Sequence, residues 1–201
     1  VSGRVDNRHY PFRSNNELNS HIYLYQPNWQ PYWPGTNYMQ PLRGSENIHN
    51  WVTDNAGYQQ EDTRAVQSNL FFKWELPWVK GLSIDGSGSY DFSGVYGKQF
   101  ETPSYVYREE GGQYVKGLSG MSRSLANLNQ TSYAVTQMYL NSKINYIRQF
   151  DVHHVALMAG YEQIQVRNST MQAGRSDFLS ISLPELNMGS SDKSKQSNSG
   201  F

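Results

Sequence analysis

Residues 64–93 read RAVQSNLFFKWELPWVKGLSIDGSGSYDFS and contain two runs in which apolar and polar side chains alternate. In the first run the even positions from Val66 to Leu76 are mostly apolar, and the odd positions are mostly polar. In the second run the even positions from Leu82 to Phe92 are apolar or glycine, and Ser and Asp fill the odd ones. Alternate side chains of a strand point to opposite faces of a sheet, so both runs predict strands with one apolar and one polar face.

A short linker with Pro77 and Gly81 joins these strands, which we therefore place at about 64–76 and 82–93 as a hairpin. The same alternation recurs at about 132–147 and 153–166 and predicts a second hairpin. In its last run the alternation shifts by one residue after Gln163, which predicts a bulge or the end of the strand there.

Long irregular segments are expected between the hairpins, at about 7–63, 94–130 and 167–201, after a short first strand at about 1–6. The first is rich in proline, which excludes a central strand or a long helix. Short turns then lie at one end of the sheet and long loops at the other. Outer-membrane barrels share this asymmetry, so we expect an all-β, antiparallel fold that is part of a transmembrane up-and-down β-barrel with long extracellular loops.

Composition narrows the function classes. Lys+Arg and Asp+Glu balance at 17 each, and no basic stripe indicates nucleic-acid binding. The chain has no cysteine, which excludes disulfides and thiolate chemistry. No stretch of about 18 apolar residues predicts a transmembrane helix, whereas barrel strands carry a weaker hydropathy signal.

Aromatic residues lie at both ends of the first hairpin, Trp74 and Trp78 by the short turn and Tyr90 and Phe92 by the long loop. Aromatic girdles of membrane barrels have this placement. The even positions should then face lipid, and the odd positions the lumen of the barrel, among them Gln67, Asn69, Lys73, Asp85 and Asp91. A soluble or surface-exposed carbohydrate-binding β-sandwich stays open as the alternative, because any antiparallel sheet alternates.

Chemistry-bearing residues form no constellation, and we predict no enzyme, metal site or cofactor. His153 and His154 are adjacent in a strand and point to opposite faces, so they cannot bind one ion together. The aromatic residues of the first long loop can contact a glycan, pack the loop on itself, or dock a partner protein. The candidates for such contacts are Tyr25, Trp29, Tyr32, Trp33 and Tyr38.

Several collinear segments resemble the SusC/RagA-type TonB-dependent outer-membrane receptors of the Bacteroidetes. The turn LPWVKGLSI at 76–84 is similar to the turn of that family, and HHVALMAGYE at 153–162 to one of its strands. The segments PYWPGT at 31–36, DNAGY at 54–58 and LPELNMGS at 183–190 are similar in the same order, as are Trp74 and the pair Tyr90-Asp91.

The resemblance implies that the chain is a segment of a longer barrel in the cell outer membrane, with no plug domain of its own. Such receptors import oligosaccharides or peptides together with a SusD-like surface lipoprotein. The TonB complex supplies energy through parts of the receptor outside this segment. The implied partners are therefore this lipoprotein, the TonB complex, the substrate and membrane lipid, and not nucleic acid.

Overall fold

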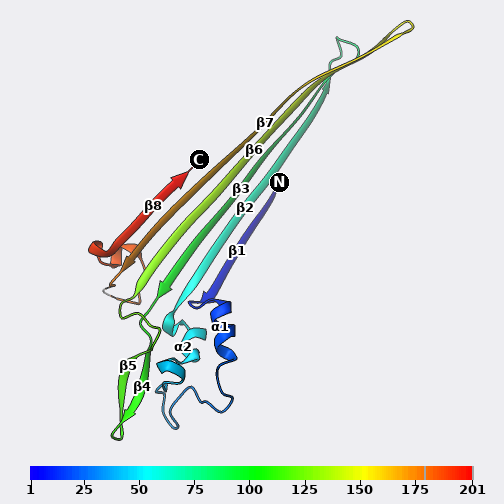
Figure 1. Cartoon of the computed structure of the whole chain (residues 1–201). Helices are drawn as coiled ribbons and strands as arrows, with labels where there is room; N and C mark the ends of the chain where they lie inside the picture. Colours follow the sequence, from blue (N-terminus) through cyan, green and yellow to red (C-terminus); the bar gives the residue numbers. More distant parts are fainter. Residues whose placement is uncertain (179, 201) are drawn as a thin grey trace.

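The computed structural model describes residues 1–178 and 180–200. Six strands form one antiparallel sheet in the order β1-β2-β3-β6-β7-β8, and β4 and β5 form a separate hairpin (Figure 1). The strands are β1 (Ser2–Pro11), β2 (Gly57–Glu75), β3 (Leu82–Glu101), β4 (Tyr105–Glu110), β5 (Gln113–Leu118), β6 (Asn127–Phe150), β7 (His153–Ser176) and β8 (Ser194–Gly200). The all-β, antiparallel class predicted from the alternation is confirmed.

Two α-helices, α1 (Asn15–Ile22) and α2 (Ile48–Val52), lie beside the loop end of the sheet (Figure 1). Short 3-10 helices occupy Arg43–Ser45, Asp54–Ala56, Leu186–Met188 and Ser191–Lys193. Within the described part of the chain, no helix is both long and apolar enough to cross a membrane.

The register of the four central strands separates their two faces. Phe72 of β2 pairs with Gly86, Gly86 with Ser142 of β6, and Ser142 with Tyr161 of β7. Even positions of β2, β3 and β6 therefore share one face with odd positions of β7, which we call the apolar face. Paired residues in adjacent strands point the same way. The predicted separation into an apolar and a polar face is confirmed for these strands.

The predicted bulge or strand end after Gln163 is wrong. β7 stays in unbroken register with β6, so that Ile164 pairs with Tyr139 and Val166 with Gln137. Backbone hydrogen bonds to β6 hold the period of two, whatever the side chains are. Ile164 and Val166 consequently lie on the polar face, which is not uniformly polar.

The strands are longer and the loops shorter than the alternation predicted. β1 continues to Pro11 instead of ending at residue 6, and β2 begins at Gly57 instead of residue 64. β3, β6 and β7 likewise continue past residues 93, 147 and 166. These extensions carry polar residues on both faces, so no alternation marks them. Cross-strand backbone hydrogen bonds extend the sheet there without an apolar pattern.

Two strand elements lie inside segments that we expected to be loops. β8, with the sequence SKQSNSG, pairs with β7 at one edge of the sheet. The β4–β5 hairpin turns at Gly111 and Gly112, whose φ angles are +62° and +82°. A two-residue turn with positive φ at both positions is the preferred hairpin connection. The Gly-Gly pair between alternating residues was thus a usable signal for this hairpin.

Buried side chains gather at the loop end of the molecule. Phe100 and Leu128 lie under the segment after β7, where Phe178 packs edge-on against Phe100 with ring centroids 5.5 Å apart. Trp51 of α2 and Val106 of β4 are also fully buried. Nearer the short turns the apolar face is uncovered, and Leu70 and Phe72 are 72% and 52% exposed. The protein's own core therefore covers only one end of the sheet.

The link between β2 and β3 brings the first hairpin against the second. Gly81 has a φ of +91°, and its carbonyl accepts a hydrogen bond of 2.8 Å from the backbone N–H of Ile147. A Cβ atom at Gly81 would collide with the carbonyl oxygen of Ile147. The turn is therefore restricted to glycine by its backbone conformation and by its contact with β6.

We expect Gly81→Ala to lower the free energy of unfolding by about 3 kcal/mol, from left-handed strain plus a backbone collision. The matched control is Gly112→Ala, which has a positive φ and no atom within 4 Å of the added Cβ. The control should cost only about 1–2 kcal/mol. Urea unfolding in detergent micelles measures both, and equal costs would contradict the contact with β6.

Candidate functional site

The polar face carries a hollow near the loop end of the sheet, centred on Gly97. The register places Glu61 and Thr131 on either side of Gly97, with Val95 before it and Gln99 after it on the same face of β3. Because Gly97 has no side chain, it leaves a gap among the neighbouring side chains on this face. Its absent side chain explains why an otherwise flat sheet face is hollowed there.

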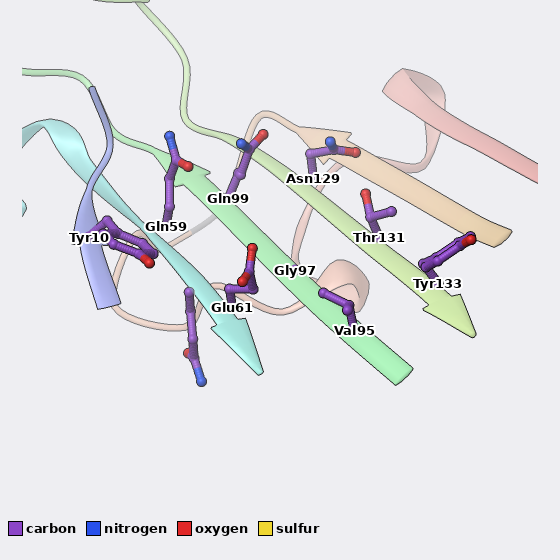
Figure 2. Close-up of a pocket in the computed structure, with 10 residues that line it drawn as sticks. Tyr10, Gln59, Glu61, Val95, Gly97, Gln99, Asn129, Thr131 and Tyr133 are labelled. Carbon is purple, nitrogen blue, oxygen red and sulfur yellow. The ribbon is translucent and has the colours of Figure 1, made fainter. Parts of the chain in front are cut away.

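The hollow has a volume of about 270 Å³. Figure 2 shows Gln59, Gln99 and Asn129 side by side along one edge of it. These three pair across neighbouring strands, and Tyr10 of β1 completes their row. The full lining consists of Tyr10, Gln59, Gln60, Glu61, Val95, Gly97, Gln99, Asn129, Thr131 and Tyr133.

Hydrogen bonds fix two of the amides and leave polar groups at the hollow. Gln59 donates from Nε2 to the carbonyl of Phe12 (2.6 Å), and Asn129 accepts at Oδ1 from Gln172 (3.1 Å). Each amide has both a donor and an acceptor group, so one bond does not exhaust it. These positioned amides can donate to and accept from a ligand.

A larger hollow of about 780 Å³ adjoins the first and shares Gln99 and Asn129 with it. It extends towards the segment before β6, where Arg123 forms an ion pair of 2.7 Å with Glu101. Lys195 of β8 contributes to its lining. The two hollows therefore lie next to each other at the loop end of the sheet.

The predicted loop aromatics form two groups, and neither lines these hollows. Tyr25 packs edge-on against Trp29 with centroids 5.4 Å apart, and its hydroxyl accepts from the backbone N–H of Ile48 (2.9 Å). Tyr32 packs against His49 at 5.4 Å. This group therefore holds the first loop against α2.

The second group joins the first loop to the β4–β5 hairpin. Trp33 donates from Nε1 to the carbonyl of Tyr107 (2.7 Å) and packs near the Tyr114 ring. Tyr38 packs on both Tyr107 and Tyr114, at 4.4 and 5.3 Å between ring centroids. Tyr38 is also 42% exposed, so one side of its ring remains open to a ligand or partner.

The predicted lumen residues lie on the polar face, nearer the short turns than the hollow. Gln67 pairs with Asp91, and Lys73 with Asp85. Asp85 also accepts a hydrogen bond of 2.6 Å from Asn145. Asn69 pairs with Ser89 on the same face. The structure thus places these five residues on one face, but separates them from the loop aromatics.

Most lining residues of the hollow were not predicted as site residues, because they fell in the segments 7–63 and 94–130 that we assigned to loops. A usable signal was present: Gln59, Glu61, Gln99, Asn129 and Thr131 continue the polar parity of their strands. The role of Gly97 is visible only once the neighbouring strands are placed, because the gap it leaves is bordered by their side chains.

Comparisons with known proteins assign the chain to no family. A scan against protein-family models finds no match, and neither does a search of curated proteins.

A carboxylate is buried among the loop segments at this end of the molecule. Glu46 is 5% exposed, and its carboxylate oxygens form no well-aligned hydrogen bond with the described residues. Burial raises the pKa of Glu46 above its ordinary value of 4.5, and the backbone N–H of Met121 and the Arg13 guanidinium oppose this only in part. Arg13 donates to the carbonyl of Met121 (2.8 Å) and stacks over Trp51.

We expect Glu46→Gln to gain stability relative to wild type as the pH rises through the region above 4.5. The folded state keeps the Glu46 proton to a higher pH than the unfolded state, so ionisation at neutral pH destabilises the fold. Urea midpoints of both proteins at pH 4 and pH 7 measure the effect.

The control is Glu17→Gln, for which we expect the opposite change of stability with pH. The backbone N–H of Ser14 donates to Glu17 (2.9 Å) and lowers the pKa of that carboxyl, so Glu17 stabilises the fold above its unfolded pKa. Glu17→Gln should therefore lose stability relative to wild type as the pH rises. The same trend in both variants would contradict the assigned burial of Glu46.

Proposed function

We propose that this chain forms part of the barrel wall and outer loops of an outer-membrane TonB-dependent transporter of the SusC type. The observation that carries the proposal is a band of uncovered apolar side chains on one face of the long central strands. In this proposal the transporter imports a glycan or peptide together with a SusD-like lipoprotein, and the TonB complex supplies the energy. These partners follow from the resemblance of the segments 76–84 and 153–162 to that family.

The length of the band supports a membrane location. It extends along β2 from Val66 to Trp74 and on to Leu76 directly after the strand, about 11 residues, and a tilted strand needs roughly 9–11 residues to cross a bilayer. Arg64, on the same face, ends the band towards the loops. At the short turn Trp74 and Trp78 pack edge-on at 5.7 Å and are 50% and 70% exposed, as residues of an interfacial girdle would be.

The border of the band also crosses the sheet obliquely. On β2 and β3 it reaches the paired residues Val66 and Phe92. On β6 it ends earlier, at Met138, and on β7 earlier still, at Tyr161, which pairs with Ser142. The border thus moves by none, two and four residues over the three steps from β2 to β7, an average of about two residues per strand. This average corresponds to a slope of roughly 50° at ~3.3 Å per residue and ~4.8 Å per strand. Strands of outer-membrane barrels tilt by about 35–45°, so a slope of this order fits strands that cross a membrane.

The turns follow the same slope. The β6–β7 hairpin continues to the pair Phe150 and His153, beyond the rung of Leu82 and Tyr146 where β3 begins. Figure 1 shows this hairpin projecting past the β2–β3 turn. The short turns are therefore displaced in the same direction as the loop-side border of the band, which supports strands that cross a slab of lipid at an angle.

The sandwich alternative has less support. It requires the apolar faces of the two hairpins to pack on each other. In the sheet the hairpins instead lie edge to edge, with β3 hydrogen-bonded to β6. Within the described residues, the second layer over the apolar face is confined to the loop end around Phe100.

The proposal predicts that Phe72→Arg costs about 2–4 kcal/mol of folding free energy in a lipid bilayer, because the charge would lie at mid-membrane. The neighbouring variant Phe71→Arg is the matched control: Phe71 is 75% exposed and lies on the polar face. It should fold with a loss of less than about 1 kcal/mol.

Both variants are measured by urea unfolding and by the yield of protein inserted into lipid vesicles. If Phe72→Arg inserts and unfolds like Phe71→Arg, the apolar face does not contact lipid. A wild-type chain that is a compact, detergent-free monomer would favour the carbohydrate-binding sandwich instead.

A further inference from the structure

We propose that the hollow over Gly97 is a binding subsite for one uncharged, hydroxyl-bearing ring, and that Glu61 selects against acidic sugars there. The inference deepens the proposed function, since it chooses a neutral glycan over a peptide and places one contact point on the wall. The inference rests on the proposed function in one respect: the substrate must pass along this face of the sheet.

The size of the hollow limits the ligand. Its volume of about 270 Å³ lies just below the usual range of ligand pockets, roughly 300–1,000 Å³. One ring of an oligomer fits better than a whole large ligand. The adjoining hollow of about 780 Å³ shares Gln99 and Asn129 with it, so further rings of the same chain have room beside the first.

The chemistry of the lining matches a sugar. Gln59, Gln99 and Asn129 offer amide donors and acceptors, and Thr131 adds a hydroxyl. A sugar ring presents hydroxyl groups around its edge that both donate and accept. The side-chain amides lie on adjacent strands of a hydrogen-bonded sheet, so their spacing is fixed before a ligand arrives, which reduces the entropic cost of binding.

Two tyrosines supply apolar contact at diagonally opposite corners of the hollow. Tyr10 lies in the row of Gln59 and Gln99, and Tyr133 pairs with Val95 on the far side of Gly97. Their side chains are 36% and 42% exposed. Half-exposed aromatic rings of this kind pack against the apolar C–H face of a sugar ring and leave its hydroxyl edge to the amides.

The charge of the lining disfavours anions in this hollow. Among the described lining residues, Glu61 alone is charged. The nearest cation, Arg8, lies 3.9 Å from Glu61 but is held closer by Asp6, at 2.8 Å. A carboxylate at the hollow accepts hydrogen bonds from hydroxyls and repels a carboxylate on the ligand.

The test measures binding to the purified protein in a detergent without a sugar headgroup, by saturation-transfer NMR. The probes are maltohexaose, cellohexaose and mannohexaose as neutral sugars, hexagalacturonate as the acidic sugar, and hexaalanine as the peptide. At least one neutral sugar should bind, and more tightly than the other two probes. Failure of all three neutral sugars to bind, or preferential binding of hexaalanine, overturns the proposal.

Gly97→Leu fills the hollow and should weaken binding of the neutral sugar by about tenfold or more. The variant is compatible with the fold, because the only atom near an added Cβ is the carbonyl oxygen of Thr131, at 4.0 Å. Gly88→Leu on the same strand is the matched control: its Cβ meets only a carbonyl oxygen at 3.7 Å, and it faces the apolar side. The control should bind like wild type. Circular dichroism verifies that both variants keep their strands, and equal binding by both overturns the site.

Glu61→Gln tests the selection against charge. It should raise the affinity for hexagalacturonate relative to the neutral sugar by roughly fivefold, since one repulsion at close range is removed. An unchanged ratio overturns the role of Glu61. Sugar binding in detergent does not require insertion into lipid, so this experiment can fail while the Phe72 variants still support the barrel wall, and the reverse also holds.

Discussion

The antiparallel register that joins β2, β3, β6 and β7 is the constraint on which the rest of the structure depends. Every residue of these strands is assigned to a face by its partner, as Phe72 is by Gly86. A slip of one residue would exchange the faces of a whole strand. The apolar band, the row of amides and the hollow over Gly97 all exist because this register is unbroken along each pair of strands.

The same sheet meets two different surroundings along its length. Near the short turns its apolar face is uncovered, whereas near the loops the segment that carries Phe178 and Leu186 covers Phe100 and Leu128. The proposed membrane location accounts for this change, since lipid would cover the first part and the protein must cover the second. Beyond the band the strands continue with mostly polar side chains on the opposite face, and this outer part carries the candidate site.

The sequence predicted a strand reliably only where one of its faces is apolar. Where one face is apolar, from Val66 to Leu76 and from Leu82 to Phe92, alternation located the strands and their faces. Where both faces are polar, as in β8, composition alone resembles a loop, and the strand was missed. Ile164 and Val166 led to the opposite error. They are apolar residues on the polar face, so the alternation shifted by one residue and predicted a bulge or strand end that the structure does not have.

The sequence by itself determined the all-β class, the two hairpins and the two faces of their alternating runs, because a period of two is a local property of the strand. Tertiary structure alone decided how far the strands extend and which residues meet around Gly97. Its neighbours Glu61 and Thr131 are brought together by hydrogen bonds between strands, which leave no mark on local composition. The contacts of the loop aromatics were likewise not predictable from the sequence. Trp33 contacts Tyr107 because the first loop folds onto the β4–β5 hairpin.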